Sequence, residues 1–259
     1  MGAYGLGFNQ PITALVVGGS GGVGRALAER LLTLHPENRV YLTSRRAPVW
    51  GLDDERAEWL TLDITDEQSW RDALLTLDAS LSARQTKLNL VFNATGLLHD
   101  ETHTPPLQPE RSMRTLELDS MSAVFAVNTF GVALALRYLT PRMTRAERAV
   151  FASCSARVGS IGDNRIGGWY SYRASKAAQH MLIKTAAIEL GRSWRHMICV
   201  ALHPGTVDTS LSAPFTSRTP AERLFTPQRS AAELSAVIEQ LTTKRSGEAI
   251  AWDGLTLPW

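Results

Sequence analysis

The sequence contains little of what marks several large classes of protein. It has two cysteines in 259 residues, Cys154 and Cys199, each inside an apolar segment. Two cysteines do not form the disulfide framework of a small secreted protein, so we expect two buried free thiols. The histidines His99, His103 and His203 do not have the spacing of metal ligands, and no metal site is predicted.

A strong charge of one sign and a long apolar stretch are also missing. The net charge is +2, and basic runs are no longer than a pair such as Arg45-Arg46. The charge pattern therefore gives no electrostatic reason to expect nucleic acid or an anionic membrane surface as a partner. Membrane-spanning helices need ~18 or more consecutive apolar residues, which the chain does not approach. The first seven residues lack the basic and apolar parts of a signal peptide, so we expect a cytoplasmic protein.

Short apolar runs alternate with helical periodicity along the whole chain. This alternation predicts βαβ units and a parallel sheet covered by helices on both faces. Repeats, low-complexity tracts and linkers are not found, so residues 1–259 are predicted to form a single-domain, Rossmann-type, doubly wound α/β fold. Strands are expected at 12–17, 40–43, 59–63, 88–92, 149–152, 197–202 and 249–252, and helices at 23–34, 66–81, 120–139, 172–194 and 231–242.

Two long loops and an apolar tail complete this organisation. Residues 98–111 and 212–228 read as surface loops, and long loops in a compact fold are often functional. The second contains Phe215 and Arg218, which suit an apolar pocket with one anionic contact, although ordinary packing of a lid explains them as well. The tail, 252–259, is apolar enough to dock on the body of the protein or on a neighbour.

A glycine-rich turn follows the first expected strand and precedes the first helix. Glycines there let the backbone approach a pyrophosphate closely, and the helix N-terminus favours its negative charge. Two registers fit the sequence. One is Gly19-x-Gly21-x-x-Gly24, the general dinucleotide fingerprint, and the other is Gly18-x-x-x-Gly22-x-Gly24.

The end of the second expected strand indicates which dinucleotide would bind. A carboxylate at this position binds the ribose 2′-hydroxyl of NAD. The chain instead has Thr43-Ser44-Arg45-Arg46, with no acidic residue. An arginine suits a 2′-phosphate through charge-assisted hydrogen bonds. The sequence therefore favours NADP(H) over NAD(H), with Ser44 and Arg45 as the contacts and Arg46 as a solvated surface charge.

Tyr172 and Lys176 stand four apart on an expected helix, so they share one face. A free tyrosine, with a pKa near ~10, is a poor base at neutral pH. A neighbouring cation favours the phenolate, so we expect Lys176 to lower the pKa of Tyr172 into a useful range for acid/base chemistry. Tyr170 is a nearby tyrosine that does not fit this pattern, because the residue four positions later is Ala174 rather than a lysine.

The glycine turn and the Tyr172/Lys176 pair together resemble the short-chain dehydrogenase/reductase family, and the second glycine register is the one that family uses. Further motifs fall in the family's order over about residues 12–254: Asp63-Ile64, Asn93-Ala94-Thr95-Gly96, Asn128 and Pro204-Gly205-Thr206-Val207. Segments 159–164 and 170–176 resemble the branch of the C-factor signalling protein and sniffer-type carbonyl reductases. The resemblance implies cofactor contacts from Gly18, Ser20, Gly22, Val23, Gly24, Ser44, Arg45, Asp63, Ile64, Asn93, Ala94, Gly96, Tyr172, Lys176, Pro204, Gly205, Thr206 and Val207.

The serine of this family's site is less plainly placed. The family has Ser-x-x-Gly after the fifth strand, but the residue three before Gly159 is Ala156. Ser155 lies one residue earlier, and we choose it because a small adjustment in a loop can bring its hydroxyl to the substrate oxygen. Ser153 and Ser160 remain alternatives.

The resemblance implies an NADP(H)-dependent oxidoreductase that moves hydride between the nicotinamide and a small carbonyl or alcohol. Tyr172 would serve as acid/base, Ser155 would orient the substrate oxygen, Lys176 would bind the ribose, and Asn128 would hold a relay water. Two alternatives are a C-factor-like signalling or sensor protein with vestigial catalysis, and an interaction protein that kept only the fold. A homodimer or homotetramer is expected through the helices of Asn128 and Tyr172.

Overall fold

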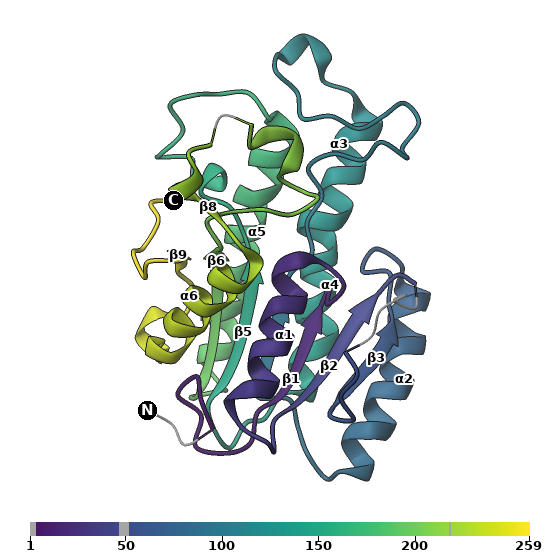
Figure 1. Ribbon diagram of the computed structural model, residues 1–259, viewed down its shortest axis with the longest axis vertical. Helices are drawn as coiled ribbons and strands as arrows, with labels where there is room; N and C mark the ends of the chain where they lie inside the picture. The colour runs from purple at the N-terminus through teal and green to yellow at the C-terminus, as the bar shows by residue number, and fades with distance from the viewer. Residues whose placement is uncertain (1–3, 47–51, 218) are drawn as a thin grey trace.

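Seven parallel strands form the centre of the fold (Figure 1). The computed structural model describes residues 4–46, 52–217 and 219–259. The strand order is β3-β2-β1-β4-β5-β6-β9, and it reverses between β1 and β4, where open α/β sheets bind ligands beyond the strands' carboxyl ends. The strands are β1 (Thr13–Val17), β2 (Arg39–Ser44), β3 (Ala57–Thr61), β4 (Leu90–Asn93), β5 (Ala149–Cys154), β6 (Met197–His203) and β9 (Ala249–Ala251).

Helices cover both faces of this sheet. Helices α1 (Gly22–Leu34) and α6 (Pro227–Gln240) pack on one face, and α2 (Glu67–Ala83), α4 (Gly131–Leu139) and α5 (Tyr170–Gly191) on the other. Each strand contributes alternate side chains to the two apolar layers, so Val150 and Phe151 belong to opposite clusters. Short 3₁₀ helices span Met113–Thr115, Thr140–Arg142, Arg157–Gly159, Ala213–Phe215, Ala221–Arg223 and Thr243–Arg245. The predicted doubly wound α/β fold is confirmed.

The largest differences from the sequence prediction concern two helices; the bounds of the others shift by one to three residues. The expected continuous helix at 120–139 is α3 (Leu118–Phe125), a π-helical turn (Ala126–Phe130) and then α4, so the prediction of one unbroken helix was wrong. Helix α6 starts four residues earlier than position 231. Its N-cap Thr226 accepts a hydrogen bond from the Arg229 N–H, and Pro227 occupies the first turn, where its missing N–H costs nothing.

The helical segment Leu118–Arg142 is long and apolar enough to cross a membrane, which the sequence reading did not anticipate. Its apolar residues are interrupted by Asp119 and Arg137. Much of it packs inside the fold against α5 and the sheet, and 44% of its apolar 18-residue stretch is buried. A buried core helix of a soluble protein has the same length and composition, so this segment is weak evidence for a membrane.

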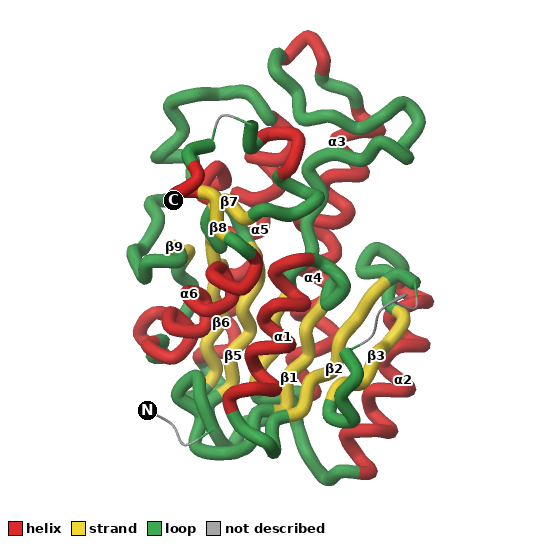
Figure 2. The backbone as a smooth tube through the Cα atoms, viewed as in Figure 1, coloured by secondary structure: helices red, strands yellow, loops and turns green. Residues whose placement is uncertain are grey.

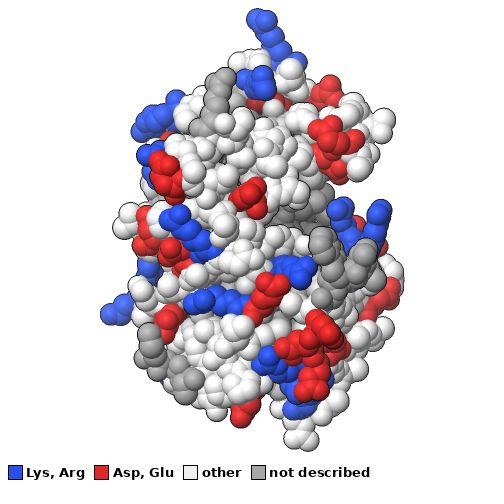
Figure 3. All heavy atoms as spheres, in the orientation of Figure 1, with Lys and Arg blue, Asp and Glu red and all other residues white. Residues whose placement is uncertain are grey.

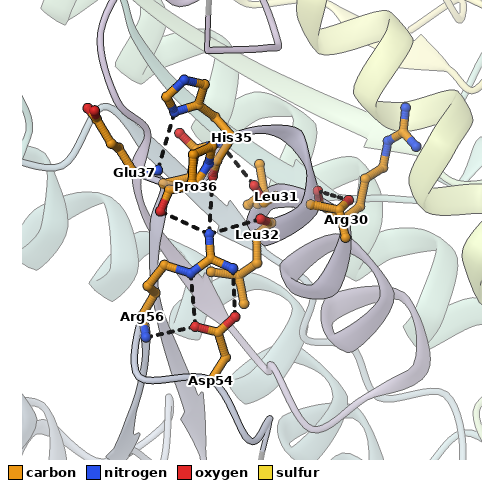
Figure 4. A network of polar contacts seen from close by, with 10 residues as sticks. Arg30, Leu31, Leu32, His35, Pro36, Glu37, Asp54 and Arg56 are labelled. Carbon is orange, nitrogen blue, oxygen red and sulfur yellow. Dashed lines mark hydrogen bonds and ion pairs between the residues drawn. The ribbon is translucent and has the colours of Figure 1, made fainter.

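The carboxyl-terminal end of α1 is held by an arginine from the segment before β3 (Figure 4). Arg56 donates to the carbonyl oxygens of Leu32, His35 and Pro36 at 3.0, 3.2 and 3.1 Å. Asp54 accepts two further hydrogen bonds from the same guanidinium, at 2.9 and 2.7 Å. A cation at a helix C-terminus satisfies unpaired carbonyl groups and complements the helix dipole. Arg56 therefore fixes α1, whose other end carries the glycine turn.

Loops gather beyond the carboxyl ends of the strands (Figure 2). Within the segment after β6, β7 (Thr206–Val207) pairs with β8 (Leu224–Phe225). The tail folds back on the body: Leu257 is buried in the core, and the Trp259 carbonyl accepts a 2.6 Å hydrogen bond from the Gly162 N–H. The tail thus docks within its own chain. Arg218 lies outside the described residues.

On the face drawn in Figure 3, basic and acidic side chains are interspersed rather than gathered by sign. This agrees with the small net charge of +2. Both cysteines are buried free thiols, as predicted, and burial raises the pKa of each to about 12. Neither thiol is therefore a thiolate nucleophile at neutral pH.

Candidate active site

The glycine turn joins β1 to α1 at the switch point of the sheet. Gly18 has a φ of +80°, which side chains rarely tolerate. A Cβ added at Gly24 would lie 2.4 Å from the Gly18 carbonyl oxygen, and one at Gly22 would lie 2.7 Å from Thr209 Cγ2. At Gly21 the nearest atom would be 3.4 Å away, an ordinary contact. Gly19 is also crowded, with Leu42 Cβ 2.8 Å from an added Cβ, but Gly21, which only the register Gly19-x-Gly21-x-x-Gly24 requires, has room for one. The geometry therefore favours the register Gly18-x-x-x-Gly22-x-Gly24.

The start of α1 has the features of an anion site. Its N-cap is Gly21, which makes no side-chain hydrogen bond to the helix, and Ser20 beside it is exposed. The turn is held from β2, because Thr43 accepts hydrogen bonds from Gly18 N–H at its Oγ1 (3.1 Å) and from Gly19 N–H at its carbonyl (2.9 Å). Val23 is half-buried and Gly24 buried behind this turn. The cradle that a Cβ would fill fits the pyrophosphate of a dinucleotide.

At the end of β2, the two residues predicted to contact a 2′-phosphate differ in their exposure to solvent. Ser44 is buried, and its hydroxyl donates to the Arg46 carbonyl. Arg45 is exposed. Hydrogen bonds from Thr102 hold the pKa of Asp100 below its usual range, and the Arg45 charge adds a smaller contribution. Arg45 thus lies near enough to the 98–111 loop for its charge to act on Asp100, and its exposed side chain is accessible to an anion.

The third and fourth strands end in tight side-chain turns. The Asp63 carboxylate accepts from the Thr65 N–H and hydroxyl at 2.9 and 2.7 Å, and Ile64 is buried. Asn93 is fully buried; its amide oxygen accepts from the Thr95 N–H and hydroxyl at 3.2 and 2.7 Å. Ala94 and Gly96, on either side of Thr95, are half-buried. These turns place the backbone of both segments at the edge where the glycine turn lies.

The segment after β6 makes a sharp turn near the same edge. Gly205 has a φ of +82°, and a Cβ there would lie 2.8 Å from the Phe225 ring. Its neighbour Pro204 accepts a hydrogen bond from Ser230 of α6 at 2.9 Å. Thr206 is exposed and Val207 buried in the small β7–β8 pair. This turn fixes the chain before it enters the loop over the site.

Tyr172 and Lys176 lie one turn apart in α5, and both are buried. Lys176 Nζ is 5.8 Å from the centre of the Tyr172 ring and donates to the Cys154 carbonyl at 3.1 Å. The Tyr172 hydroxyl has no hydrogen-bond partner within the three described ranges of the chain. A phenol held without a protein partner is free to exchange a proton with a substrate.

The expected effect of Lys176 on the Tyr172 pKa was wrong. Burial raises the pKa of Tyr172 above its usual value because it desolvates the phenolate, and Cys154 adds a smaller shift in the same direction. Burial also lowers the pKa of Lys176 to about 8. Tyr172 is therefore a protonated phenol at neutral pH, the form in which it can donate.

Asn128 lies in the π-helical turn and is fully buried. Its amide oxygen accepts from the Leu97 N–H at 2.8 Å, and its amide nitrogen donates to the Leu97 carbonyl at 2.8 Å and to Ser175 Oγ at 3.1 Å. Asn128 therefore links the segment after β4 to α5 through hydrogen bonds, beside Lys176. π-helical turns are frequent at functional sites, but apolar periodicity gives no signal for one.

The three candidate serines have different surroundings. Ser153 is fully buried and accepts from Asn93 Nδ2 at 3.0 Å and from Gln179 Nε2 at 2.7 Å. Ser160 is 2% exposed and accepts from the Asp163 N–H. Ser155, directly after β5, has its Oγ 2.6 Å from His180 Nε2. The arrangement favours Ser155 over Ser153, because Ser155 follows the end of β5 and is 5% exposed, whereas Ser153 lies inside the strand and is fully buried.

Aromatic side chains from two loops surround Tyr172. The Trp169 ring makes edge contacts with Tyr172 and with Phe215, at 6.2 and 5.1 Å between ring centres. Phe215 also contacts His99, at 5.6 Å. The loop after β7 thus reaches over the site, as predicted, and meets the 98–111 loop there.

Comparison with known proteins agrees with these motifs. A family model described as short chain dehydrogenase matches residues 12–220. The chain belongs to the short-chain dehydrogenase family. Members of this family are oxidoreductases that use nicotinamide cofactors, so the glycine turn and the Tyr172/Lys176 pair lie in a dehydrogenase fold, as the sequence indicated.

Relatives within the short-chain dehydrogenase family share most of the chain. A 1-hydroxy-2-glutathionyl-2-methyl-3-butene dehydrogenase of Rhodococcus sp. is 30% identical over 95% of this chain and 99% of its own. The C-signal protein of Myxococcus xanthus is 29% identical over 54% of this chain and 78% of its own. The second similarity agrees with the resemblance to the C-factor branch.

Solved structures show the same fold. An NADPH-bound carbonyl reductase from chicken fatty liver is 25% identical, with a TM-score of 0.81 over 96% of this chain and 100% of that one. The Drosophila melanogaster carbonyl reductase Sniffer has a TM-score of 0.81 over the same shares, at 20% identity. At that identity the second likeness concerns the fold alone.

Proposed function

We propose that this protein is an NADP(H)-dependent reductase that interconverts a small carbonyl compound and its alcohol. The observation that carries the proposal is the buried Tyr172/Lys176 pair at the sheet edge that carries the glycine turn, with a phenol hydroxyl that has no hydrogen-bond partner among the residues the structure describes. The NADPH-bound carbonyl reductase of similar structure supports the choice of cofactor and reaction.

Tyr172 and Ser155 would act together on the substrate oxygen. In the reducing direction Tyr172 donates its phenolic proton to the oxygen as negative charge develops there. Ser155 donates a hydrogen bond to the same oxygen and orients it. The Lys176 ammonium, 5.8 Å from the Tyr172 ring, then stabilises the phenolate that the transfer leaves behind.

The cofactor would be held along the carboxyl edge of the sheet. Its pyrophosphate fits the turn at Gly18, Gly22 and Gly24, with Arg45 at the 2′-phosphate and Lys176 at the nicotinamide ribose. When bound, the nicotinamide supplies or accepts the hydride. Asn128 would hold a water that connects Lys176 to solvent, so that the phenol can regain its proton between turnovers.

The direct test is consumption of NADPH against a panel of aldehydes and ketones, with the reverse reaction assayed on the alcohols. Turnover of at least one pair, dependent on Tyr172, is expected. Tight NADPH binding without turnover on any pair would instead support a signalling or sensor protein. The similarity to C-signal is the observation that favours this second candidate. A protein that binds neither nucleotide would have kept the fold alone.

Replacement of Arg45 by alanine tests the cofactor preference. Loss of a charge-assisted hydrogen bond to the 2′-phosphate costs about 1.5–3 kcal/mol, so KM for NADPH should rise about 10- to 100-fold. KM for NADH, which has no such phosphate, should stay within about twofold. Arg46→Ala is the matched control and should leave both values near those of the unchanged protein. An equal loss for both nucleotides in Arg45→Ala would contradict the assignment.

We propose a homodimer or homotetramer, formed through the helices that carry Asn128 and Tyr172. Large apolar side chains on their outer surfaces support this: Phe130 is 59% exposed, and Met181 and Ile188, seven residues apart on α5, are 66% and 54% exposed. Light scattering is expected to give a multiple of 28.4 kDa, and Met181→Lys should shift it toward the monomer. A monomer at micromolar concentration would disprove the proposal. A cytoplasmic location stays a prediction.

A further inference from the structure

His180 is a buried residue of α5 that the proposed reaction does not use. It lies one turn beyond Lys176 and two turns beyond Tyr172, so it continues the same helix face. Its side chain meets the end of β5 beside two other polar contacts. Lys176 and Gln179 donate to the Cys154 carbonyl at 3.1 and 3.0 Å, and His180 Nε2 is 2.6 Å from Ser155 Oγ.

The imidazole of His180 is enclosed on several sides. A Cβ added at Gly159 would lie 3.1 Å from His180 Cε1 and 2.8 Å from the Lys176 Cβ, so the glycine leaves the room that both side chains need. The Trp259 ring makes an edge contact with the imidazole at 5.8 Å between ring centres. With His180 2% exposed, the ring has little freedom to turn away from Ser155.

The direction of this hydrogen bond decides what Ser155 can do. A hydroxyl has one hydrogen to donate and lone pairs with which to accept. A substrate carbonyl oxygen only accepts, so Ser155 must keep its hydrogen for the substrate. Burial, with a smaller contribution from Lys176, lowers the pKa of His180 to about 4, so the ring is neutral and carries one N–H. If that hydrogen is on Nε2, Ser155 accepts from it and its own hydrogen stays free.

We propose that His180 is a positioning residue, whose Nε2–H donates to Ser155 Oγ and directs the serine hydrogen toward the substrate oxygen. This rests on the proposed function, because it requires Ser155 to contact the substrate. It also accounts for Ala156 at the place three before Gly159. A hydroxyl one residue earlier lies against α5, and a fixed partner on α5 is what would hold it in a productive orientation.

The experiment compares His180→Leu, which removes both ring nitrogens, with His180→Gln, whose amide can still donate to Ser155. We expect kcat for carbonyl reduction to fall about tenfold or more in His180→Leu and to be largely restored in His180→Gln. KM for NADPH should be unchanged in both variants. His196→Leu, at an exposed position before β6, is the control for the substitution itself.

A double-mutant cycle with Ser155→Ala separates the outcomes. If His180 acts through Ser155, His180→Leu adds no further loss of kcat in the Ser155→Ala background. Two outcomes would overturn the inference and leave the proposed function standing. In the first, His180→Leu lowers kcat by the same factor with and without Ser155. In the second, kcat is normal in His180→Leu although Ser155→Ala lowers it. If Ser155→Ala itself has full activity, the serine assignment fails first, and the positioning role with it.

Nitrogen-15 spectra of histidine in the unchanged protein give a second measurement that does not depend on how the variants fold. They should show His180 as a neutral ring with its hydrogen on Nε2. A hydrogen on Nδ1 would mean that Ser155 donates to His180, and the proposed role would be wrong.

Discussion

Tyr172→Phe should abolish turnover while NADPH still binds. The phenylalanine ring keeps the packing against Trp169 but has no proton to give, and positioned proton transfer contributes about 10²- to 10⁴-fold to rate. We expect kcat to fall at least about 10³-fold, and Kd for NADPH to change by less than about threefold. Steady-state kinetics and a fluorescence titration with NADPH measure the two values.

Tyr170→Phe is the matched control for this variant. Tyr170 is two residues earlier on the same helix, is 39% exposed, and has Ala174 rather than lysine one turn on, so near-normal rates are expected. Near-normal rates in Tyr172→Phe would remove Tyr172 from the mechanism. Because burial raises the Tyr172 pKa, alcohol oxidation, which needs the phenolate, should accelerate as pH rises from 7, while the protonated donor for reduction persists across that range.

Gly24→Ala should damage both cofactor binding and stability. Its Cβ would meet the Gly18 carbonyl oxygen at 2.4 Å and the Ala94 methyl group at 3.1 Å, and neither belongs to a flexible side chain that could move away. Relief requires the start of α1 to shift from the turn. We expect the free energy of unfolding to fall by about 2 kcal/mol or more, and the affinity for NADPH to fall about 100-fold. Thermal unfolding with and without NADPH measures both changes.

Gly21→Ala separates this steric argument from a general need for glycine. The added methyl would have its nearest neighbour at 3.4 Å, and the Gly21 φ of −78° suits alanine. Stability and NADPH affinity should stay close to those of the unchanged protein. Equal damage at both positions would favour the register Gly19-x-Gly21-x-x-Gly24 and contradict the one that the structure selects.

The fold was predictable because its signals are local. Apolar runs such as the one at β1 and the glycine turn after it need only short stretches of sequence to be recognised, and alternating strands and helices leave few possible topologies. The spacing of Tyr172 and Lys176 predicted that they share one helix, as α5 shows, whereas Asn128 was predicted from the resemblance to the family. Their proximity in the structure comes from the packing of α5 against the π-helical turn, where Asn128 donates to Ser175.

What escaped prediction depends on contacts between distant segments. The π-helical turn places Asn128 in a hydrogen bond with the Leu97 peptide, 31 residues away in the sequence. His180 meets Ser155 only after α5 packs on the end of β5. The sign of the Tyr172 pKa shift depends on how deeply the ring is buried, which residue spacing does not reveal.

The docked tail has a practical consequence for handling the protein. Trp259 contacts Gly162 and the His180 ring, so a tag or reporter joined after it would begin beside the serine loop. Tyr4 packs on His35, the C-cap of α1, at the end of that helix away from the glycine turn. Purification tags therefore belong at the amino end. A fluorescent label at the carboxyl end would instead serve as a probe of changes around His180 and Ser155.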